Sequence, residues 1–371
     1  MTAFVPSRRS VLKAAGLAAA ATVLGPTPHT RAADDGTYPR LAWRPPTAPA
    51  LTVPLNMDAN TQRMFPTLMP AGSYLPNALD AWYLWLWTHD TSRTYLYTAP
   101  SPTGPFTPRG FGAAPVDYPA GYLSGHFSSG DIVWDPQGQR LVSSPHGLRL
   151  GAVPGNGEAS QDSFLTTSTD GLTWSWLDGD NRPRLVCGAP GSPDSVHTGY
   201  GRLLRDLDGQ LMTANGRYWW MYRAQRRDAP LPNGQKVPTS YTPYLASAGS
   251  LSADFTTKQK AFDTLQSSTG LFDVGSFVRA AAAHHVFMVE GTAITFPTYS
   301  LYNKTGLDNM SFLPRPVPLA LPKPDETVAL SGGGNLVRDP VTGEQYLAQI
   351  GIRLNPSQSE VWIYRGVEPP T

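Results

Sequence analysis

The sequence predicts an all-β protein, and three of its features support this prediction. The 371-residue chain contains 35 glycines and 37 prolines, and only 15% of its residues are charged, which indicates many tight turns and little exposed helix. Short apolar runs rich in aromatic and β-branched residues alternate with turn sequences along most of the chain. A two-strand pattern also returns several times, which is typical of a repeat architecture.

The N-terminus has the order of an export signal. The sequence SRRSVLK at residues 7–13 precedes a mild apolar run at 14–24 and a small-residue site at 32–33. This order resembles a bacterial twin-arginine signal peptide, and its apolar run is too short to remain as a membrane anchor. We therefore expect residues 1–33 to be removed on export to the extracellular or cell-envelope space of a bacterium. Residues 34–371 are then expected to form a single domain.

Charge and cysteine content exclude several function classes. The chain has 29 basic and 28 acidic residues, and the first 33 residues hold four of the basic ones and no acidic one. The exported chain is thus slightly acidic and is not expected to bind nucleic acid. The single cysteine, Cys187, excludes an internal disulfide and a cysteine-based zinc site, so we interpret it as a small buried apolar residue. We expect no membrane association after cleavage, and a monomer.

The clearest structural unit is a hairpin at Gly125–Gly147. Its first strand is predicted at Asp131–Trp134, and the sequence DPQGQ at 135–139 forms the turn, because proline fixes φ and glycine tolerates positive φ. The second strand returns to His146. Since antiparallel strands bring the start of the first and the end of the second to one edge, His126 and His146 are expected to be neighbours.

Related hairpins occur before and after this one. Each predicted inner hairpin has two apolar strands, the second ending near a polar residue, and the further copies are Ser73–Asp90, Gly199–Arg223, Gly275–Gly291 and Gly332–Gly351. Outer strand pairs with Ser/Thr-rich turns follow the first four hairpins, at Thr94–Gly110, Ser163–Leu177, Tyr244–Lys258 and Thr298–Pro314. The turn Ser168–Trp174, STDGLTW, is close to the Asp-box turns of sialidase-type propellers, in which the aspartate caps its own turn and has a structural role.

These repeats predict a five-bladed β-propeller with four-stranded antiparallel blades. The fifth outer pair has only one strand, Glu360–Arg365, before the chain ends. A closed ring takes the missing strand from the N-terminal end, within Arg40–Pro54, which also removes exposed sheet edges. The rival fold, a two-sheet sandwich with a second domain, explains the strands but not the ordered return of inner and outer hairpins.

Polar residues recur at equivalent places in these hairpins. First-strand starts carry His126, Tyr200 and Ser276, with His197 and Asp273 just before them; second-strand ends carry His89, His146, Arg223, Glu290 and Gln349. In a propeller these positions meet at one mouth of the central channel, so the pattern predicts a ligand site.

Several of these residues suggest a role. Glu290, which follows an apolar strand, is the best candidate for a carboxylic acid with a raised pKa. Asp131 either braces its strand or supplies a second carboxylate, and both interpretations stay open. An arginine within a first strand needs a buried partner or a channel to face, as with Arg202, Arg205 and Arg279. The predicted catalytic residues are Glu290, Asp131, His126 and His146; the predicted substrate-binding residues are Tyr200, Arg223, His89, Arg202, Asp273 and Gln349.

The hairpin GHFSSGDIVWD with PHG, the turn STDGLTW and the segment SPTGPFT together resemble secreted five-bladed propellers of the glycoside hydrolase superfamily that includes arabinanases, arabinofuranosidases and fructosidases. The resemblance covers most of Thr67–Arg365. It implies cleavage of a glycosidic bond in a central pocket by a first-blade Asp, a Glu acid and a supporting Asp. Glu290 matches the acid and Asp131 the supporting carboxylate. No first-blade Asp matches, because Asp80 lies at a turn and Asp58 precedes the blade.

We therefore expect an exported carbohydrate-active enzyme that cleaves glycosidic bonds of a poly- or oligosaccharide. The missing first-blade aspartate leaves two alternatives. One is a polysaccharide lyase, in which Arg neutralises the carboxylate of a uronic acid while His or Tyr removes the C5 proton. The other is a non-catalytic glycan-binding propeller. A divalent cation such as calcium is compatible with either enzyme, but no ligand spacing specifies one.

Overall fold

The computed structural model describes residues 42–44, 46–54, 63–88, 93–113, 118–150, 160–225, 241–261, 272–280, 283–290, 298–303, 317–319, 328–354 and 357–367. In these ranges the regular structure consists of β-strands and two short 3-10 turns, Ala71–Ser73 and Leu177–Gly179, so the prediction of an all-β protein is confirmed. None of the described segments is a helix long and apolar enough to cross a membrane. The predicted signal at 1–33 lies outside the described residues.

The first sheet is four-stranded and antiparallel. Its strands, in spatial order, are β3 (Arg63–Met69), β4 (Trp82–Thr88), β5 (Arg93–Ala99) and β6 (Thr107–Ala113). The outer pair is where the sequence predicts it, but the inner hairpin is not confined to Ser73–Asp90, because its first strand lies upstream. Pro66 lies in that strand at a register shift between Met64 and Thr67, and a proline inside an apolar run argues against a strand when only the sequence is read.

The second group of strands contains the predicted hairpin. Its members are β7 (Tyr122–Ser128), β8 (Ile132–Asp135), β9 (Arg140–Ser143), β10 (His146–Arg149), β11 (Gln161–Ser163), β12 (Thr166–Ser168) and β13 (Ser175–Trp176). β8 and β9 pair around the turn at 136–139, as predicted, and β7 continues the pairing with β10. An interruption between β7 and β8 divides the group into two sheets, ordered β11-β10-β7 and β13-β12-β9-β8.

The third and fourth sheets follow in chain order. The third contains β14 (Arg202–Leu203), β16 (Thr213–Ala214), β17 (Arg217–Gln225), β18 (Tyr241–Ala248) and β19 (Thr257–Lys260). The fourth contains β15 (Arg205–Asp206), β20 (Phe272–Ala280), β21 (Ala283–Glu290), β22 (Thr298–Asn303) and β23 (Val317–Leu319). Both predicted inner hairpins are present, through the pairs β14–β17 and β20–β21. β23 lies beyond the predicted end of the fourth outer pair at Pro314, and β15 joins β20 in parallel, which the hairpin pattern does not predict.

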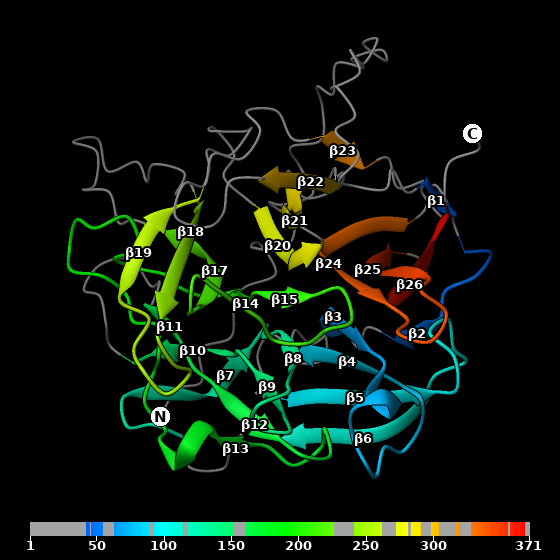
Figure 1. The fold of residues 1–371 in the computed structure, drawn as a ribbon, viewed down its shortest axis with the longest axis horizontal. Helices are drawn as coiled ribbons and strands as arrows, with labels where there is room; N and C mark the ends of the chain where they lie inside the picture. Colours follow the sequence, from blue (N-terminus) through cyan, green and yellow to red (C-terminus); the bar gives the residue numbers. More distant parts are fainter. Residues whose placement is uncertain are drawn as a thin grey trace.

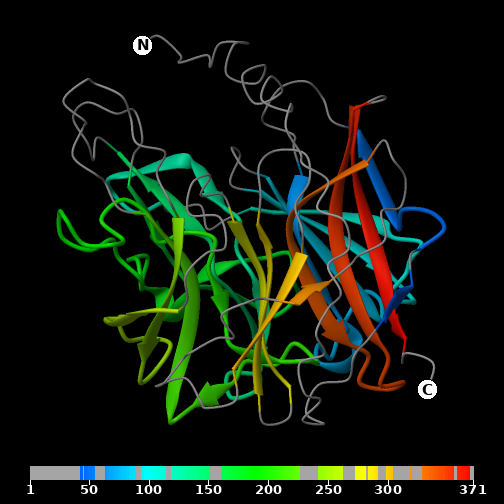
Figure 2. The same cartoon turned by 90° about the horizontal axis from the view of Figure 1, so that it is seen from above.

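The fifth sheet joins the two ends of the described chain. β24 (Val328–Arg338), β25 (Gln345–Leu354) and β26 (Ser357–Val367) are antiparallel neighbours. β1 (Ala42–Arg44) and β2 (Leu51–Pro54) both pair with β26, so the predicted N-terminal strand within Arg40–Pro54 is confirmed. In Figure 2 these blue N-terminal strands lie beside the red C-terminal strand.

Apolar side chains pack the first sheet against the second group, the second group against the third sheet, and the first sheet against the fifth. Trp85 and Trp87 of the first sheet share a buried cluster with Ile132 of the second group, and a separate cluster joins that group to the third sheet. A further cluster joins the first sheet to the fifth, through residues such as Leu86 and Ile350. Figure 1 shows the sheets following one another around the middle of the view, where β3, β14, β15, β20 and β24 lie. Six sheets arranged in this way do not fit the rival two-sheet sandwich.

The predicted Asp turn closes the β12–β13 hairpin. Asp170 Oδ1 accepts hydrogen bonds from the backbone N–H groups of Leu172 and Thr173, each at 2.7 Å. Burial alone would raise the pKa of Asp170, but the hydrogen bonds from Thr173, Leu172 and Ser168 outweigh it and hold this pKa below its ordinary value. The turn also fixes neighbouring sheets, because Trp85 Nε1 donates to the Gly171 carbonyl at 3.0 Å.

The Asp170→Ala substitution is expected to lower the free energy of unfolding by about 1–2 kcal/mol, because two backbone donors lose their acceptor. Asp170→Asn is the matched control, since its Oδ1 can keep both bonds and most of the stability. A lowered folded pKa means that the wild-type carboxylate stabilises the fold above the unfolded pKa of about 3.9 and loses that effect as the pH falls through the folded value. Urea unfolding at neutral pH and in acid measures both; equal midpoints for the three proteins would contradict the capping role.

Removal of residues 1–54 is expected to abolish cooperative unfolding or to cause aggregation, because it exposes the edge of β26 beside buried Val361. A chain that begins at residue 41 is the control and should unfold cooperatively. Circular dichroism in urea and size-exclusion chromatography provide the readouts. Cooperative, monomeric behaviour of both chains would show that β1 and β2 are dispensable.

Candidate functional site

Every inner strand is irregular near its middle or its start. The pairing of β3, β20 and β24 shifts register, at Met64/Thr67, Val274/Ser276 and Ser331/Asn335. Three non-glycine residues nearby adopt the left-handed backbone region. Phe65 (φ 53°) lies at the register shift of β3, Ser129 (φ 57°) precedes β8, and Tyr200 (φ 57°) precedes β14. Such conformations cost of order 1–3 kcal/mol each and concentrate at functional sites. Strained backbone therefore marks the inner strands of the first three strand groups.

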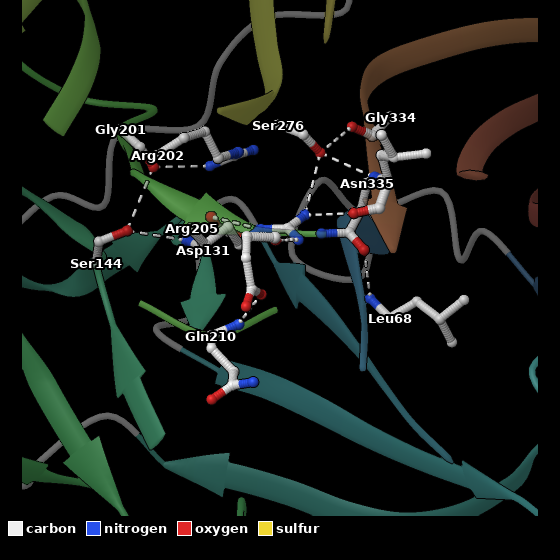
Figure 3. A network of polar contacts seen from close by, with 12 residues as sticks. Leu68, Asp131, Ser144, Gly201, Arg202, Arg205, Gln210, Ser276, Gly334 and Asn335 are labelled. Carbon is white, nitrogen blue, oxygen red and sulfur yellow. Dashed lines mark hydrogen bonds and ion pairs between the residues drawn. The ribbon is translucent and has the colours of Figure 1, made fainter. Parts of the chain in front are cut away.

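Polar side chains at the same level join each strand group to the next. We call them the central belt: Ser128, Ser144, Arg202, Arg205, Ser276 and Asn335, most of which are seen in Figure 3. Ser128 donates to the Thr88 carbonyl at 2.5 Å, which links the second group to the first sheet. Ser144 donates to the Gly201 carbonyl at 3.3 Å, and Arg202 donates to the Ser129 carbonyl at 3.2 Å, which links the second group to the segment that leads into the third sheet.

The remaining belt residues complete the series. The Arg205 guanidinium donates to Ser276 Oγ at 3.3 Å and to the Leu336 carbonyl at 2.7 Å. Ser276 Oγ accepts from the Leu336 N–H at 2.9 Å and donates to the Gly334 carbonyl at 3.0 Å. Asn335 Oδ1 accepts from the Leu68 N–H at 3.0 Å, which returns to the first sheet. Buried hydrogen bonds thus link the first group to the second, the second to the third, the fourth to the fifth, and the fifth back to the first, while the short segment from β14 to β15 joins the third group to the fourth.

Asp131 lies beside this belt and is 1% exposed. Its carboxylate is 4.0 Å from Arg205 Nε, and within the described residues neither carboxylate oxygen has a hydrogen-bond partner. Burial raises the pKa of Asp131 above its ordinary value, and the positive charges of Arg205 and Arg202 oppose that rise. The Asp131 N–H donates to Ser144 Oγ at 3.1 Å, so this residue is also held through its backbone.

A second polar group packs near the belt. We call it the histidine cluster: His126, His146, His197, Tyr200 and Arg223. The centres of the His126 and His146 rings are 5.3 Å apart, which confirms the prediction that they are neighbours. Tyr200 is at the centre of the cluster. Its ring lies 4.7 Å from His146 and 5.4 Å from His197, and the Arg223 guanidinium lies over it at 4.0 Å.

Backbone contacts set the orientation of two histidines. His197 Nδ1 lies 2.8 Å from the Arg223 carbonyl, which can only accept, so this contact requires a hydrogen on Nδ1. The same Nδ1 is 3.0 Å from the Gly199 N–H, a longer contact that would need the opposite tautomer. His146 Nδ1 instead faces the Tyr200 N–H at 3.5 Å and acts as an acceptor. A Cβ at Gly199 would lie 2.9 Å from both rings, so only glycine fits there.

The predicted site residues are distributed between these two groups. His126, His146, Tyr200 and Arg223 lie in the histidine cluster, and Arg202 is part of the belt beside Asp131. Gln349 is buried in β25, where a Cβ added at Gly334 would lie 2.8 Å from its Oε1. Asp273 and Glu290 lie in β20 and β21, where Phe272 pairs with Glu290, but their side chains are outside the described residues. His89 is also outside them.

The structure adds two residues to which the sequence assigns neither a catalytic nor a substrate-binding role. His197 precedes the first strand and has no assigned role in the sequence interpretation, yet it stacks on Tyr200. Phe65 also contacts Tyr200, with ring centres 5.3 Å apart. The signal in the sequence is the pair of glycines around Tyr200, since glycine permits close approach. A Cβ at Gly201 would lie only 1.8 Å from Trp220 Nε1.

A calcium ion does not fit the described part of this site. No group of three or more His, Cys, Asp or Glu side chains that could hold a metal occurs among the described residues. Calcium prefers oxygen ligands, whereas the histidine cluster offers ring nitrogens beside a guanidinium.

Comparisons with known proteins identify the fold. No known family model and no curated protein matches the chain. Among solved structures it is similar to an α-L-arabinofuranosidase from Lactobacillus brevis (TM-score 0.56, 9% identity, covering 83% of this chain and 91% of that one). It is also similar to a thermostable family-43 glycoside hydrolase (0.56, 10%, 83% and 95%) and to Zg3597, a family-117 glycoside hydrolase from Zobellia galactanivorans (0.53, 12%, 88% and 90%). The resemblance to glycoside hydrolases is thus confirmed at the level of the fold.

Arg205→Met is expected to destabilise the protein by about 3–5 kcal/mol, because Asp131 then lies buried without an opposing charge and the Leu336 carbonyl loses a donor. Arg217→Met, a change at a half-buried surface arginine bound to Ser247, should cost about 1 kcal/mol or less. The Asp131→Asn/Arg205→Met double variant should lose less unfolding free energy than the Asp131→Asn and Arg205→Met single variants lose together. Denaturant titrations of the set test this, and strict additivity would exclude coupling between the two side chains.

Proposed function

We propose that the chain is a five-bladed β-propeller that acts on a carbohydrate and cleaves a glycosidic bond at the histidine cluster. Five strand groups that follow one another in chain order support the blade count. The Asn335–Leu68 contact and the pairing of β1 and β2 with β26 support closure between the last group and the first. Similarity to solved glycoside hydrolases supports the substrate class.

The observation that carries the proposal is the histidine cluster itself. Imidazole, phenol and guanidinium groups converge from the second group of strands, from the segment that precedes β14, and from β17. All five side chains are buried, and Tyr200 and Arg223, each 7% exposed, are the least buried of them. Hydrogen-bonding groups beside an aromatic ring are suited to a sugar, which offers both hydroxyls and an apolar face.

In the hydrolytic version of this proposal, Glu290 is the general acid and Asp131 a supporting carboxylate. The strand β3 carries no aspartate or glutamate, and Asp80 lies in the loop before β4, where its Oδ1 accepts from the Ala81 N–H. A first-blade carboxylate is therefore not among the described residues of this site. The usual pair of acidic groups that flank the bond in glycoside hydrolysis would have to come from Glu290 and a second carboxylate.

One observation favours a second candidate, elimination from a uronic acid. Tyr200 lies between Arg223 and His146, so a phenol, a cation and an imidazole share one place. In elimination, the phenolate form of Tyr200 or His126 would take the C5 proton, the C4–O bond would break, and the departing oxygen would take that proton back from the same base, while Arg223 would balance the charge of the substrate carboxylate. The products would be a free hydroxyl on one sugar and a C4–C5 double bond on the other.

Export by the twin-arginine route, a mature domain of residues 34–371, and a monomeric state complete the proposal. They rest on the sequence of residues 7–33 and on the single series of strand groups. The alternative is a propeller that binds glycans without cleaving them, and an assay for cleavage products distinguishes it from an enzyme.

The purified protein is expected to cleave at least one member of a panel of neutral and uronic-acid polysaccharides. New reducing ends without ultraviolet absorbance indicate hydrolysis, and absorbance from a conjugated C4–C5 double bond indicates elimination. Binding without either product indicates a lectin and would contradict the enzyme proposal. Absence of binding to every glycan would remove the carbohydrate class altogether.

Tyr200→Phe is expected to lower kcat by roughly 10²–10⁴-fold if its phenol transfers a proton, and by much less if hydrolysis depends on Glu290. Tyr218→Phe is the control, because Tyr218 lies at the end of β17 opposite to Arg223. The substitution removes a hydroxyl that bonds only Gln137 in the described structure and should leave activity unchanged. Glu290→Gln should lower kcat strongly if the reaction is hydrolysis and only slightly if it is elimination. Full activity of both Tyr200→Phe and Glu290→Gln would move the chemistry to other residues.

A further inference from the structure

We infer that His197 is a positioning residue of the proposed site, which holds Tyr200 and Arg223 in place for the substrate without meeting the substrate itself. The inference rests on the proposed function. It follows from the contacts of His197 with its backbone neighbours, with Arg223 and with Tyr200, and from its burial.

The backbone of His197 is fixed between two groups of strands. It forms isolated bridges to Gln161 at the start of β11 and to Gln225 at the end of β17. The flanking peptide groups are also bonded, with Val196 N–H donating to Gln225 at 3.0 Å and Thr198 N–H donating to Gln161 at 2.9 Å. His197 therefore starts from a rigid segment, which is what a residue needs in order to orient others.

The ring of His197 reaches both residues that it would orient. Its plane is within 9° of the Tyr200 plane, and its Nδ1 lies 2.8 Å from the Arg223 carbonyl. The Arg223 guanidinium lies over the same Tyr200 ring. The His197 imidazole therefore holds the Arg223 backbone and the Tyr200 ring in place at the same time. Tyr200 needs such support, because its left-handed backbone persists only if its surroundings hold it.

His197 is more deeply buried than the two residues that it would orient. His197 is 3% exposed and His146 is 0% exposed, whereas Tyr200 and Arg223 retain 7%. The two histidines also contact the backbone differently, since Nδ1 of His197 faces a carbonyl and Nδ1 of His146 faces an N–H. With hydrogen on Nδ1 for the Arg223 carbonyl, His197 has the opposite tautomer to His146, whose Nδ1 accepts from the Tyr200 N–H, and both rings pack against Tyr200.

Two substitutions divide the role of His197 into its parts. His197→Asn can keep a side-chain N–H near the Arg223 carbonyl but lacks the ring, and His197→Phe keeps a ring but lacks the donor. We expect each to lower kcat/KM at least about tenfold, with both limbs of the pH–rate profile retained, because the groups that transfer protons are still present. Unchanged kcat/KM in both folded variants overturns the inference. Loss of one limb of the profile in both also overturns it, since His197 would then be an acid or base itself.

A second measurement does not depend on activity. Ring-nitrogen NMR of protein labelled with ¹⁵N-histidine, with the His197 signals identified by their loss in His197→Asn, shows which nitrogen carries hydrogen. A hydrogen on Nδ1 is expected, and an Nδ1 without hydrogen overturns the inference. Failure of the proposed function would appear differently, as a wild-type protein inactive on every glycan, and the NMR result then decides the geometry alone.

Discussion

The fold depends on how the buried peptide groups of the inner strands are satisfied. A strand in the middle of the molecule cannot rely on water, so each N–H and C=O that its sheet leaves unpaired needs a protein partner. Ser276 illustrates the solution, because its single hydroxyl accepts from the Leu336 N–H and donates to the Gly334 carbonyl of another sheet. The belt residues repeat this arrangement between successive groups of strands. They fix the level of each inner strand relative to the next, and therefore the place where the polar ends of those strands meet.

This constraint explains why strain is located beside the site. Register shifts in the inner strands turn backbone groups away from their own sheet and toward the belt. Ser129 and Tyr200 adopt positive φ there, and the Ser129 carbonyl so exposed accepts from Arg202. The energy of these conformations is recovered from buried hydrogen bonds to charged groups, which are stronger than neutral ones. The same turn of the backbone directs the Tyr200 ring to His146 and Arg223, so the stability of the belt and the geometry of the cluster are linked.

Local patterns in the sequence predict much of this arrangement, and long-range pairing predicts little of it. The Asp135–Gln139 turn, the Asp170 turn and the neighbouring positions of His126 and His146 follow from turn chemistry and antiparallel pairing within a few residues. The closing strand at residues 51–54 is predicted because the fifth outer pair has only one strand near the C-terminus, which leaves one strand to be supplied by the N-terminal end. The predicted range of the first inner hairpin is wrong, because Pro66 makes β3 look unlike a strand in the sequence. The parallel pairing of β15 with β20 has no local sequence signal. Arg205 could be recognised as needing a partner, but its bonds to Ser276 and Leu336 span 71 and 131 positions, which no local pattern encodes.

The placement of Asp131 bears on which groups carry the chemistry. A general acid needs a proton to exchange and a path to the substrate, but Asp131 is 1% exposed beside Arg205 and Arg202. Burial favours its neutral form and the two guanidinium groups favour its charged form, so its charge is set by the belt and not by solvent. A carboxylate held in this way acts through its field, by stabilising positive charge on nearby groups. Under the proposed function, proton transfer therefore falls to other groups, and the candidates are Tyr200 and His126 of the cluster and Glu290 of β21. The proposed function thus divides the work between the belt, which fixes the charge around Asp131, and the histidine cluster with Glu290, which would exchange protons.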